Sequence, residues 1–310
     1  MTKVSPFELG AHTLIYRKES LERALQGIAQ AGFSCVGLWT EHEGRPIMSL
    51  RPGTAEISTL RRRIEGFGLT PVTMLARERA MEDRSMLLAD LDLCASLGLP
   101  LLQAIGPWPF VSGHERKPEM RWYGEVERFL SILEYGAEQA TQRGVTIALK
   151  PHRGATATGA DLMDVIHRVG SEGVRACWDA GNVRFYEGID SEDDLERSGI
   201  APLVRSVCIK DHVGGKGNPH FPVPGDGQVD HARLLHALAK AGFSGPLLAE
   251  RVDQPTAEES DRALSRTRAF LQSQVDRLAD GSPAKSQGDR TQANRSSSEA
   301  DVSSDDLASG

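Results

Sequence analysis

Short apolar or β-branched runs alternate along the chain with longer stretches in which apolar residues recur at helical spacing. Short apolar runs bounded by turn residues are typical of buried strands. The expected strands cover residues 8–15, 35–39, 70–75, 101–105, 145–150, 175–178, 204–209 and 246–249. Because strands that alternate with helices pair in parallel through crossover connections, the pattern predicts an α/β fold with a parallel sheet.

The helical stretches include SLERALQGIAQAG, MLLADLDLCASLG, EVERFLSILEYGAEQATQRG, DLMDVIHRVG and DHARLLHALAKAG, and several end at a glycine suited to a helix C-terminus. Two segments are near-copies, IAQAGFSCVGL from Ile28 and LAKAGFSGPLL from Leu238. This repeated helix-to-strand unit favours a closed barrel of similar units. An open doubly wound sheet is the alternative, but no GxGxxG follows the first strand, which also argues against a nucleotide cofactor. We therefore expect a (β/α)₈ barrel.

The last thirty or so residues differ in composition from the rest of the chain. The segment GSPAKSQGDRTQANRSSSEADVSSDDLASG has almost no large apolar side chains, so little burial is available to offset the entropy of ordering it. We expect one barrel domain over residues 1–279 and a disordered Ser-, Asp- and Gly-rich tail over residues 280–310. The tail is interpreted as a dispensable extension rather than a regulated tether.

Charge and composition narrow the function. The 310 residues carry a formal net charge of −7, which offers no basic surface for nucleic acid and favours a small-molecule substrate. No signal peptide or membrane-spanning run is visible, so we expect a cytoplasmic protein with no membrane partner. The cysteines form no CxxC pair, which disfavours a zinc knuckle and a disulfide framework; they are Cys35, Cys94, Cys177 and Cys208.

Candidate chemistry gathers where the later strands end. In a barrel of this kind the catalytic groups come from the C-terminal strand ends. The fifth to eighth strands run into TIALKPHRG, RACWDAGN, VCIKDH and PLLAERVD. Their titratable side chains would converge on one pocket, as expected of a reactive site; they are Lys150, His152, Asp179, Cys208, Lys210, His212 and Glu250.

Other polar and aromatic residues are placed near the same mouth by the predicted strand ends. With Lys210, the expected substrate-binding residues are His12, Trp108, Arg153 and Asn182. Lys216, beside the pair Gly214 and Gly215, is a weaker candidate for holding a phosphate or carboxylate, because no helix follows the glycines.

These motifs resemble the xylose-isomerase-like TIM-barrel superfamily of sugar isomerases and epimerases, which is also related to endonuclease IV. The resemblance covers about residues 7–275 and includes SLERALQGIAQAGFSCVGLW, ALKPHRG, CWDAGN, CIKDH and PGDGQVDHARLLHALAKAGFSGPLLAE. It implies a divalent metal, Mn²⁺, Mg²⁺ or Zn²⁺, held by Glu, Asp, His and Glu from strands five to eight. Asp179 and Glu250 match that ligand set, whereas Lys150 stands at the place of the first Glu and Cys208 at the place of the His.

These replacements alter the electrostatics that the resemblance implies. The usual ligands carry about −3 and suit a hard dication, whereas the residues here sum to about −1. One alternative is a displaced metal site built from His152, Asp179, His212 and Glu250. In another, Lys150 replaces the metal and stabilises an enediolate oxyanion, directly or through a Schiff base after burial has lowered its pKa. In a third, Lys150 is only a buried ion-pair partner.

The resemblance and the strand ends together predict an isomerase or epimerase. It would act on a ketose, a keto-sugar or a small hydroxy-keto acid by removing a proton next to the carbonyl. Glu250 would be the base, Asp179 would position a metal or Lys150, and His152 or His212 would supply the second proton. A lyase acting through the same enolate is the runner-up, and a catalytically inactive binding or partner subunit is the alternative of another class. Because sugar-isomerising relatives often assemble as dimers or tetramers, a homo-oligomer is a further expectation.

Overall fold

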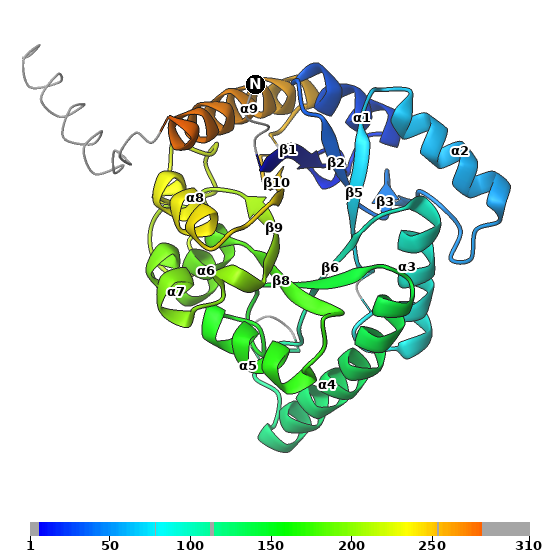
Figure 1. Ribbon diagram of the computed structural model, residues 1–310, viewed down its shortest axis with the longest axis vertical. Coiled ribbons are helices and arrows are strands. Elements are labelled where there is room, and N and C mark those ends of the chain that lie inside the picture. Colours follow the sequence, from blue (N-terminus) through cyan, green and yellow to red (C-terminus); the bar gives the residue numbers. More distant parts are fainter. Residues whose placement is uncertain (1–5, 78, 112–114, 253, 281–310) are drawn as a thin grey trace, which may run out of the picture.

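Eight parallel strands close into a ring with the helices outside it (Figure 1). The computed structural model describes residues 6–77, 79–111, 115–252 and 254–280. In spatial order the barrel strands are β1 (Phe7–His12), β10 (Gly245–Ala249), β9 (Val204–Ile209), β8 (Val174–Trp178), β7 (Thr146–Lys150), β6 (Leu101–Ile105), β5 (Thr70–Leu75) and β2 (Cys35–Leu38). The predicted (β/α)₈ barrel is therefore confirmed. The predicted tail lies outside the described residues except for Asp280.

The helices begin and end largely at the residues that their caps favour. They are α1 (Leu21–Gln30), α2 (Thr54–Glu65), α3 (Arg84–Leu97), α4 (Glu119–Gln142), α5 (Gly159–Val169), α6 (Ala180–Glu187), α7 (Ser191–Ser198), α8 (His231–Lys240) and α9 (Ala257–Ala279). Helix α5 begins with a capping box between Thr158 and Asp161 and ends at Gly170, which has a positive φ of 63°. None of the helices in the described ranges is long and apolar enough to cross a membrane.

The two near-copies in the sequence form the same local structure. Gly32 follows α1 and Gly242 follows α8, with φ angles of 84° and 81° that favour glycine. Each is followed by a buried phenylalanine, Phe33 or Phe243, and then by the next barrel strand. The repeat therefore marks two helix-to-strand turns of the barrel, as the sequence predicts.

The segment after the first strand differs from the prediction. The strand was expected over residues 8–15, but β1 ends at His12 and the chain continues as the 3₁₀ helix η1 (Thr13–Tyr16). The Thr13 hydroxyl accepts a hydrogen bond from Trp39 N at 2.9 Å, and the Tyr16 hydroxyl donates to Asp261 on α9 at 2.6 Å. These long-range bonds favour a tight turn over a longer strand.

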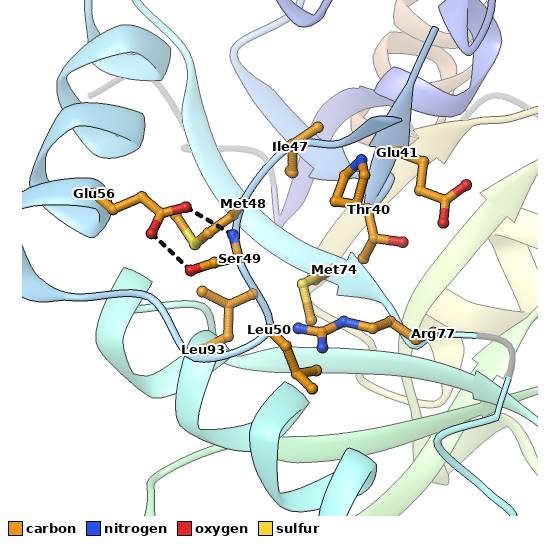
Figure 2. A pocket seen from close by; sticks show the side chains of 11 residues that line it. Thr40, Glu41, Ile47, Met48, Ser49, Leu50, Glu56, Met74, Arg77 and Leu93 are labelled. Carbon is orange, nitrogen blue, oxygen red and sulfur yellow. Dashed lines mark hydrogen bonds between the residues drawn. The ribbon is translucent and has the colours of Figure 1, made fainter. Parts of the chain in front are cut away.

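A small hairpin, β3 (Glu41–His42) and β4 (Arg45–Pro46), lies between β2 and α2. It borders a cavity of about 540 Å³ (Figure 2). Met74 and Arg77 from the end of β5 line the same cavity. Its lining does not include the charged strand-end residues described next.

Candidate active site

Four charged side chains meet inside the C-terminal mouth of the barrel, and we call them the ion quartet. Lys150 ends β7, Asp179 follows β8, Lys210 follows β9 and Glu250 follows β10. All four are buried, with exposures of 7%, 0%, 3% and 4%. Four of the seven strand-end side chains expected to share one pocket thus come together as ion pairs.

The quartet is held by direct ion pairs. Lys150 Nζ donates to both carboxylate oxygens of Glu250, at 3.0 Å each, and lies 3.6 Å from Asp179 Oδ2. Lys210 Nζ lies 2.7 Å from Glu250 Oε1 and 3.0 Å from Asp179 Oδ2. Two ammonium groups therefore share two carboxylates, and the four formal charges sum to zero.

The DAGN motif explains how Asp179 and Lys210 are positioned. Asp179 caps α6 by accepting a hydrogen bond from Asn182 N at 3.0 Å. The Asn182 side chain donates to Pro151 O at 2.8 Å and accepts from Lys210 Nζ at 3.1 Å. A Cβ at Gly181 would lie within 2.8 Å of Lys210 Cδ, so glycine is needed at that position. Asn182, predicted to bind substrate, here fixes Lys210.

Burial and pairing act in opposite directions on the pKa values of the quartet. Burial disfavours the Lys150 ammonium, but the charges facing it, first that of Glu250, hold its pKa well above the usual value. Burial likewise acts against the Glu250 carboxylate, but Lys150 and Lys210 hold its pKa well below the usual value. The alternative in which burial leaves Lys150 with a lowered pKa is therefore wrong, because its two ion pairs outweigh the effect of burial. A raised pKa keeps the Lys150 amine protonated, which disfavours Schiff-base formation.

The residues present do not fit the divalent metal that the resemblance implies. Lys150 Nζ lies between the carboxylates of Glu250 and Asp179, where its positive charge would repel a dication. Among the described residues, one group of ligand atoms lies within 4.8 Å of one another, from His12, Cys208 and Glu250. Glu250 is already paired, and burial raises the pKa of the Cys208 thiol well above its usual value. This group therefore offers a cation neither a free carboxylate nor a ready thiolate.

The displaced ligand set is not brought together either. His152 Nε2 is hydrogen-bonded to the Tyr186 hydroxyl at 2.8 Å. His212 is fully buried, and its Nε2 is bonded to Asn218 O at 2.8 Å. Neither ring belongs to a metal-sized group with Asp179 and Glu250 in the described chain. Two strand-end histidines thus have partners of their own, which sequence spacing alone does not reveal.

A layer of buried polar side chains lies close to the quartet. His12 Nε2 is 4.0 Å from Glu250 Oε2 and 3.9 Å from Cys208 Sγ. The sulfur atoms of Cys208 and Cys177 are 3.6 Å apart. Burial lowers the pKa of His12 to about 4, so the ring is neutral near pH 7. Because His12 is fully buried, the structure does not expose it as the predicted substrate contact.

Aromatic rings line one side of the mouth. The His152 ring lies 5.1 Å from the Trp108 ring and 4.3 Å from the Tyr186 ring, measured between centroids. Burial, followed by the charges of Lys150, Lys210 and Arg153, lowers the pKa of His152 to about 3. Tyr186 was not predicted, although a signal existed: Asp179, Asn182 and Tyr186 are spaced to share one face of α6.

The weaker anion-site candidate has another role. Lys216 has an exposed side chain (63%) and pairs with Glu187 at 3.1 Å, so this weak candidate is not a free anion-binding lysine.

Asp211, in the CIKDH motif, was not predicted as a site residue. Its carboxylate accepts hydrogen bonds from Gly225 N at 2.9 Å, Gly227 N at 3.0 Å and Val229 N at 2.9 Å. These bonds fix the PGDGQV loop next to β9. The pairing of CIKDH with PGDG in one sequence was the available signal, but spacing alone did not show that they touch.

The fold and the charged strand ends define a (β/α)₈ barrel with its candidate active site at the C-terminal mouth. The xylose isomerase-like TIM barrel family matches residues 25–274, and the chain belongs to this family. Among the curated proteins, none matches the sequence significantly.

Solved structures share the fold at low sequence identity. A xylose isomerase domain protein from Planctomyces limnophilus is 15% identical, with a TM-score of 0.69 over 90% of this chain and 100% of that one. A xylose isomerase domain protein from Alicyclobacillus acidocaldarius is 21% identical, with a TM-score of 0.66 over 87% and 98%. D-psicose 3-epimerase from Clostridium cellulolyticum H10, solved with D-tagatose, is 16% identical, with a TM-score of 0.65 over 86% and 98%.

Proposed function

We propose that this barrel is a keto-sugar isomerase or epimerase in which two lysine ammonium groups take the electrophilic role. The observation that carries the proposal is the convergence of Lys150 Nζ and Lys210 Nζ on Glu250 Oε1, at 3.0 and 2.7 Å. A paired positive charge in a buried site is suited to stabilising the oxyanion of an enediolate. The family match and the 3-epimerase among the solved neighbours support sugar chemistry of this kind.

The proposed step begins with an exchange of partners. The carbonyl oxygen and the adjacent hydroxyl of the substrate bind the two ammonium groups, which weakens their pairing with Glu250. Since those ion pairs hold the pKa of Glu250 low, loosening them raises its basicity. Glu250 then takes the proton from the carbon next to the carbonyl, and the electron pair moves onto the carbonyl oxygen. Lys150 and Lys210 hold the resulting enediolate.

The proton then returns to carbon. Delivery to the opposite face of the same carbon epimerises the sugar, and delivery to the neighbouring carbon isomerises it. His152 is neutral and bonded to the Tyr186 hydroxyl at 2.8 Å, so in this proposal the pair relays a proton rather than supplying one from an imidazolium. Asp179 acts as a positioning residue for Lys210. His212, bonded to Asn218 O, has no part in this step.

Deuterium exchange tests the proposal. The protein is incubated in D₂O with D-fructose, D-tagatose and D-psicose, with EDTA present, and deuterium at the carbon next to the carbonyl is followed by NMR. We expect exchange that survives EDTA and falls at least 100-fold in Lys150→Met. Lys216→Met, at an exposed lysine, is the matched control and keeps the parent rate. Glu250→Gln, which retains an oxygen for the lysines, provides a second inactive variant if Lys150→Met does not fold.

Two outcomes contradict the proposal. One is the absence of exchange with any of these ketoses. The other is exchange that EDTA abolishes and Mn²⁺ restores, which would show that a metal ion supplies the electrophile. Loss of a substituent from the labelled sugar, rather than exchange alone, would select the lyase.

A non-catalytic binding subunit is the second candidate, and one observation favours it. Every member of the ion quartet already has an oppositely charged partner within 3.6 Å, as a purely structural network would. Saturable binding of a ketose without any exchange would select this candidate.

A further inference from the structure

Arg153 is a cation without an acidic partner in the described part of the chain. It makes neither an ion pair nor a side-chain hydrogen bond there, and its buried Nε is unpartnered. Its neighbours are aromatic: the guanidinium carbon lies 5.6 Å from the centre of the Trp108 ring and 5.2 Å from that of Tyr186. Stacking of this kind leaves the N–H groups at the edge of the guanidinium free to donate.

The backbone holds Arg153 in this position. Gly154 follows with a φ of 84°, and a Cβ there would lie 2.7 Å from Trp108 Cα and closer still to Pro107 O. Ala155 N donates to Pro107 O at 3.1 Å. The loop after β7 is therefore packed against the loop after β6, and the Arg153-Gly154 pair permits that approach. The packing of these two loops therefore fixes the backbone of Arg153 at the mouth of the barrel.

The charges around Arg153 indicate which ligand group it would bind. The ion quartet sums to zero, so among the described residues Arg153 leaves this side of the mouth with an uncompensated positive charge. This positive charge acts on the neighbouring His152 ring, where Lys150, Lys210 and Arg153 all lower the pKa. Glu250, the quartet carboxylate that acts on the same ring, raises it to a lesser extent. An anionic group is the complement of this environment.

We propose that the substrate carries a carboxylate, bound by Arg153, at the end of a keto-sugar chain away from the reacting carbonyl. This inference rests on the proposed function for the reacting end. A single planar guanidinium matches one carboxylate through two parallel hydrogen bonds. A phosphate would bring a second negative charge, for which the Trp108–Arg153–Tyr186 group has no second cation.

Matched ligands test the substrate class. D-fructose, D-fructuronate and D-fructose 6-phosphate have the same ketose portion and differ at C6, and their binding is measured by calorimetry at one ionic strength. We expect D-fructuronate to bind at least 10-fold more tightly than D-fructose. Arg153→Gln removes that advantage and leaves the affinity for D-fructose unchanged. Arg168→Gln, at a surface arginine paired with Glu127, retains the parent's preference.

The inference is overturned if D-fructuronate binds no better than D-fructose, if it does not bind, or if D-fructose 6-phosphate binds most tightly. Failure of this inference is distinguishable from failure of the proposed function. Arg153-dependent binding of D-fructuronate without deuterium exchange would retain the carboxylate site and refute the isomerase. Exchange that proceeds equally on D-fructose and D-fructuronate, in the parent and in Arg153→Gln, would retain the isomerase and refute the carboxylate site.

Discussion

Gly181 lies on α6 directly against the Lys210 side chain. A Cβ atom at this position would come within 2.8 Å of Lys210 Cδ and closer to Cγ, which is well inside the optimal separation of nonbonded carbon atoms. Lys210 in turn pairs with Glu250 and Asp179. The absence of a Cβ at residue 181 therefore leaves the space that the Lys210 side chain occupies.

We expect Gly181→Ala to displace Lys210 and lower the exchange rate roughly 10- to 100-fold, while overpacking costs about 1–3 kcal/mol of stability. Enzyme assay and urea unfolding measure the two effects. Gly124→Ala is the matched control, because a Cβ there meets nothing within 4 Å and lies inside α4. That change should raise the free energy of unfolding by about 0.5–1 kcal/mol and leave the exchange rate unchanged. A Gly181→Ala protein with the parent's rate would refute the role assigned to this contact.

At the scale of elements, one carboxylate holds a whole loop. Asp211 accepts hydrogen bonds from the backbone N–H groups of Gly225, Gly227 and Val229, and from that of His212 at 2.9 Å. Nearby His231, 3.7 Å away, and these N–H groups lower the pKa of Asp211 although burial acts to raise it. The loop lies between β9 and α8, so its position depends on a charged acceptor.

We expect Asp211→Asn to lower the free energy of unfolding by about 1–3 kcal/mol. An amide has only one oxygen acceptor, and its NH₂ group would face N–H donors. Hydrogen exchange at the amides of Gly225, Gly227 and Val229 should become faster. Asp226→Asn changes an acid in the same loop whose exposed pair with Arg266 is worth little, and it should leave these amides protected. Equal protection in both variants would show that Asp211 does not hold the loop.

The elements that sequence predicts best are those determined locally. Strands β5, β6 and β9 have the predicted bounds, because each is a β-branched or apolar run between turn residues. The end of β1 was missed because a contact with Asp261, 245 residues from Tyr16 along the chain, favours the 3₁₀ turn. The hairpin of β3 and β4 was also not predicted, since two-residue strands carry no periodic signal.

At the scale of the whole molecule, barrel closure brings distant residues together. Lys150 and Glu250 lie 100 positions apart and still form a bidentate pair. That their strand ends share a mouth could be predicted from the sequence, because the barrel requires it. The direction of the Lys150 pKa shift could not, because burial and pairing oppose each other and only the distances decide between them. His212 was likewise assigned to the mouth by strand alternation, yet its ring is bonded to Asn218 O.

Stability toward acid follows from the same buried interior. Burial, the largest cause, and the charges of Lys150 and Lys210 lower the pKa of His12 from 6.5 to about 4. Between these pH values the unfolded chain binds a proton at this residue and the folded barrel does not. His12 therefore has no effect on the free energy of unfolding above pH 6.5. That free energy falls as the pH drops toward 4, and by then the loss due to His12 is about 3 kcal/mol.

We expect the free energy of unfolding of the parent to fall more steeply between pH 6.5 and pH 4 than that of His12→Gln, whose residue 12 does not titrate. Urea denaturation at pH 7.5, 6, 5 and 4.5 measures both slopes. His167→Gln, at an exposed histidine, is the control and should follow the parent. Parallel slopes for the parent and His12→Gln would mean that His12 accepts a proton within the fold. That result would mean that the His12 ring is in contact with water rather than buried.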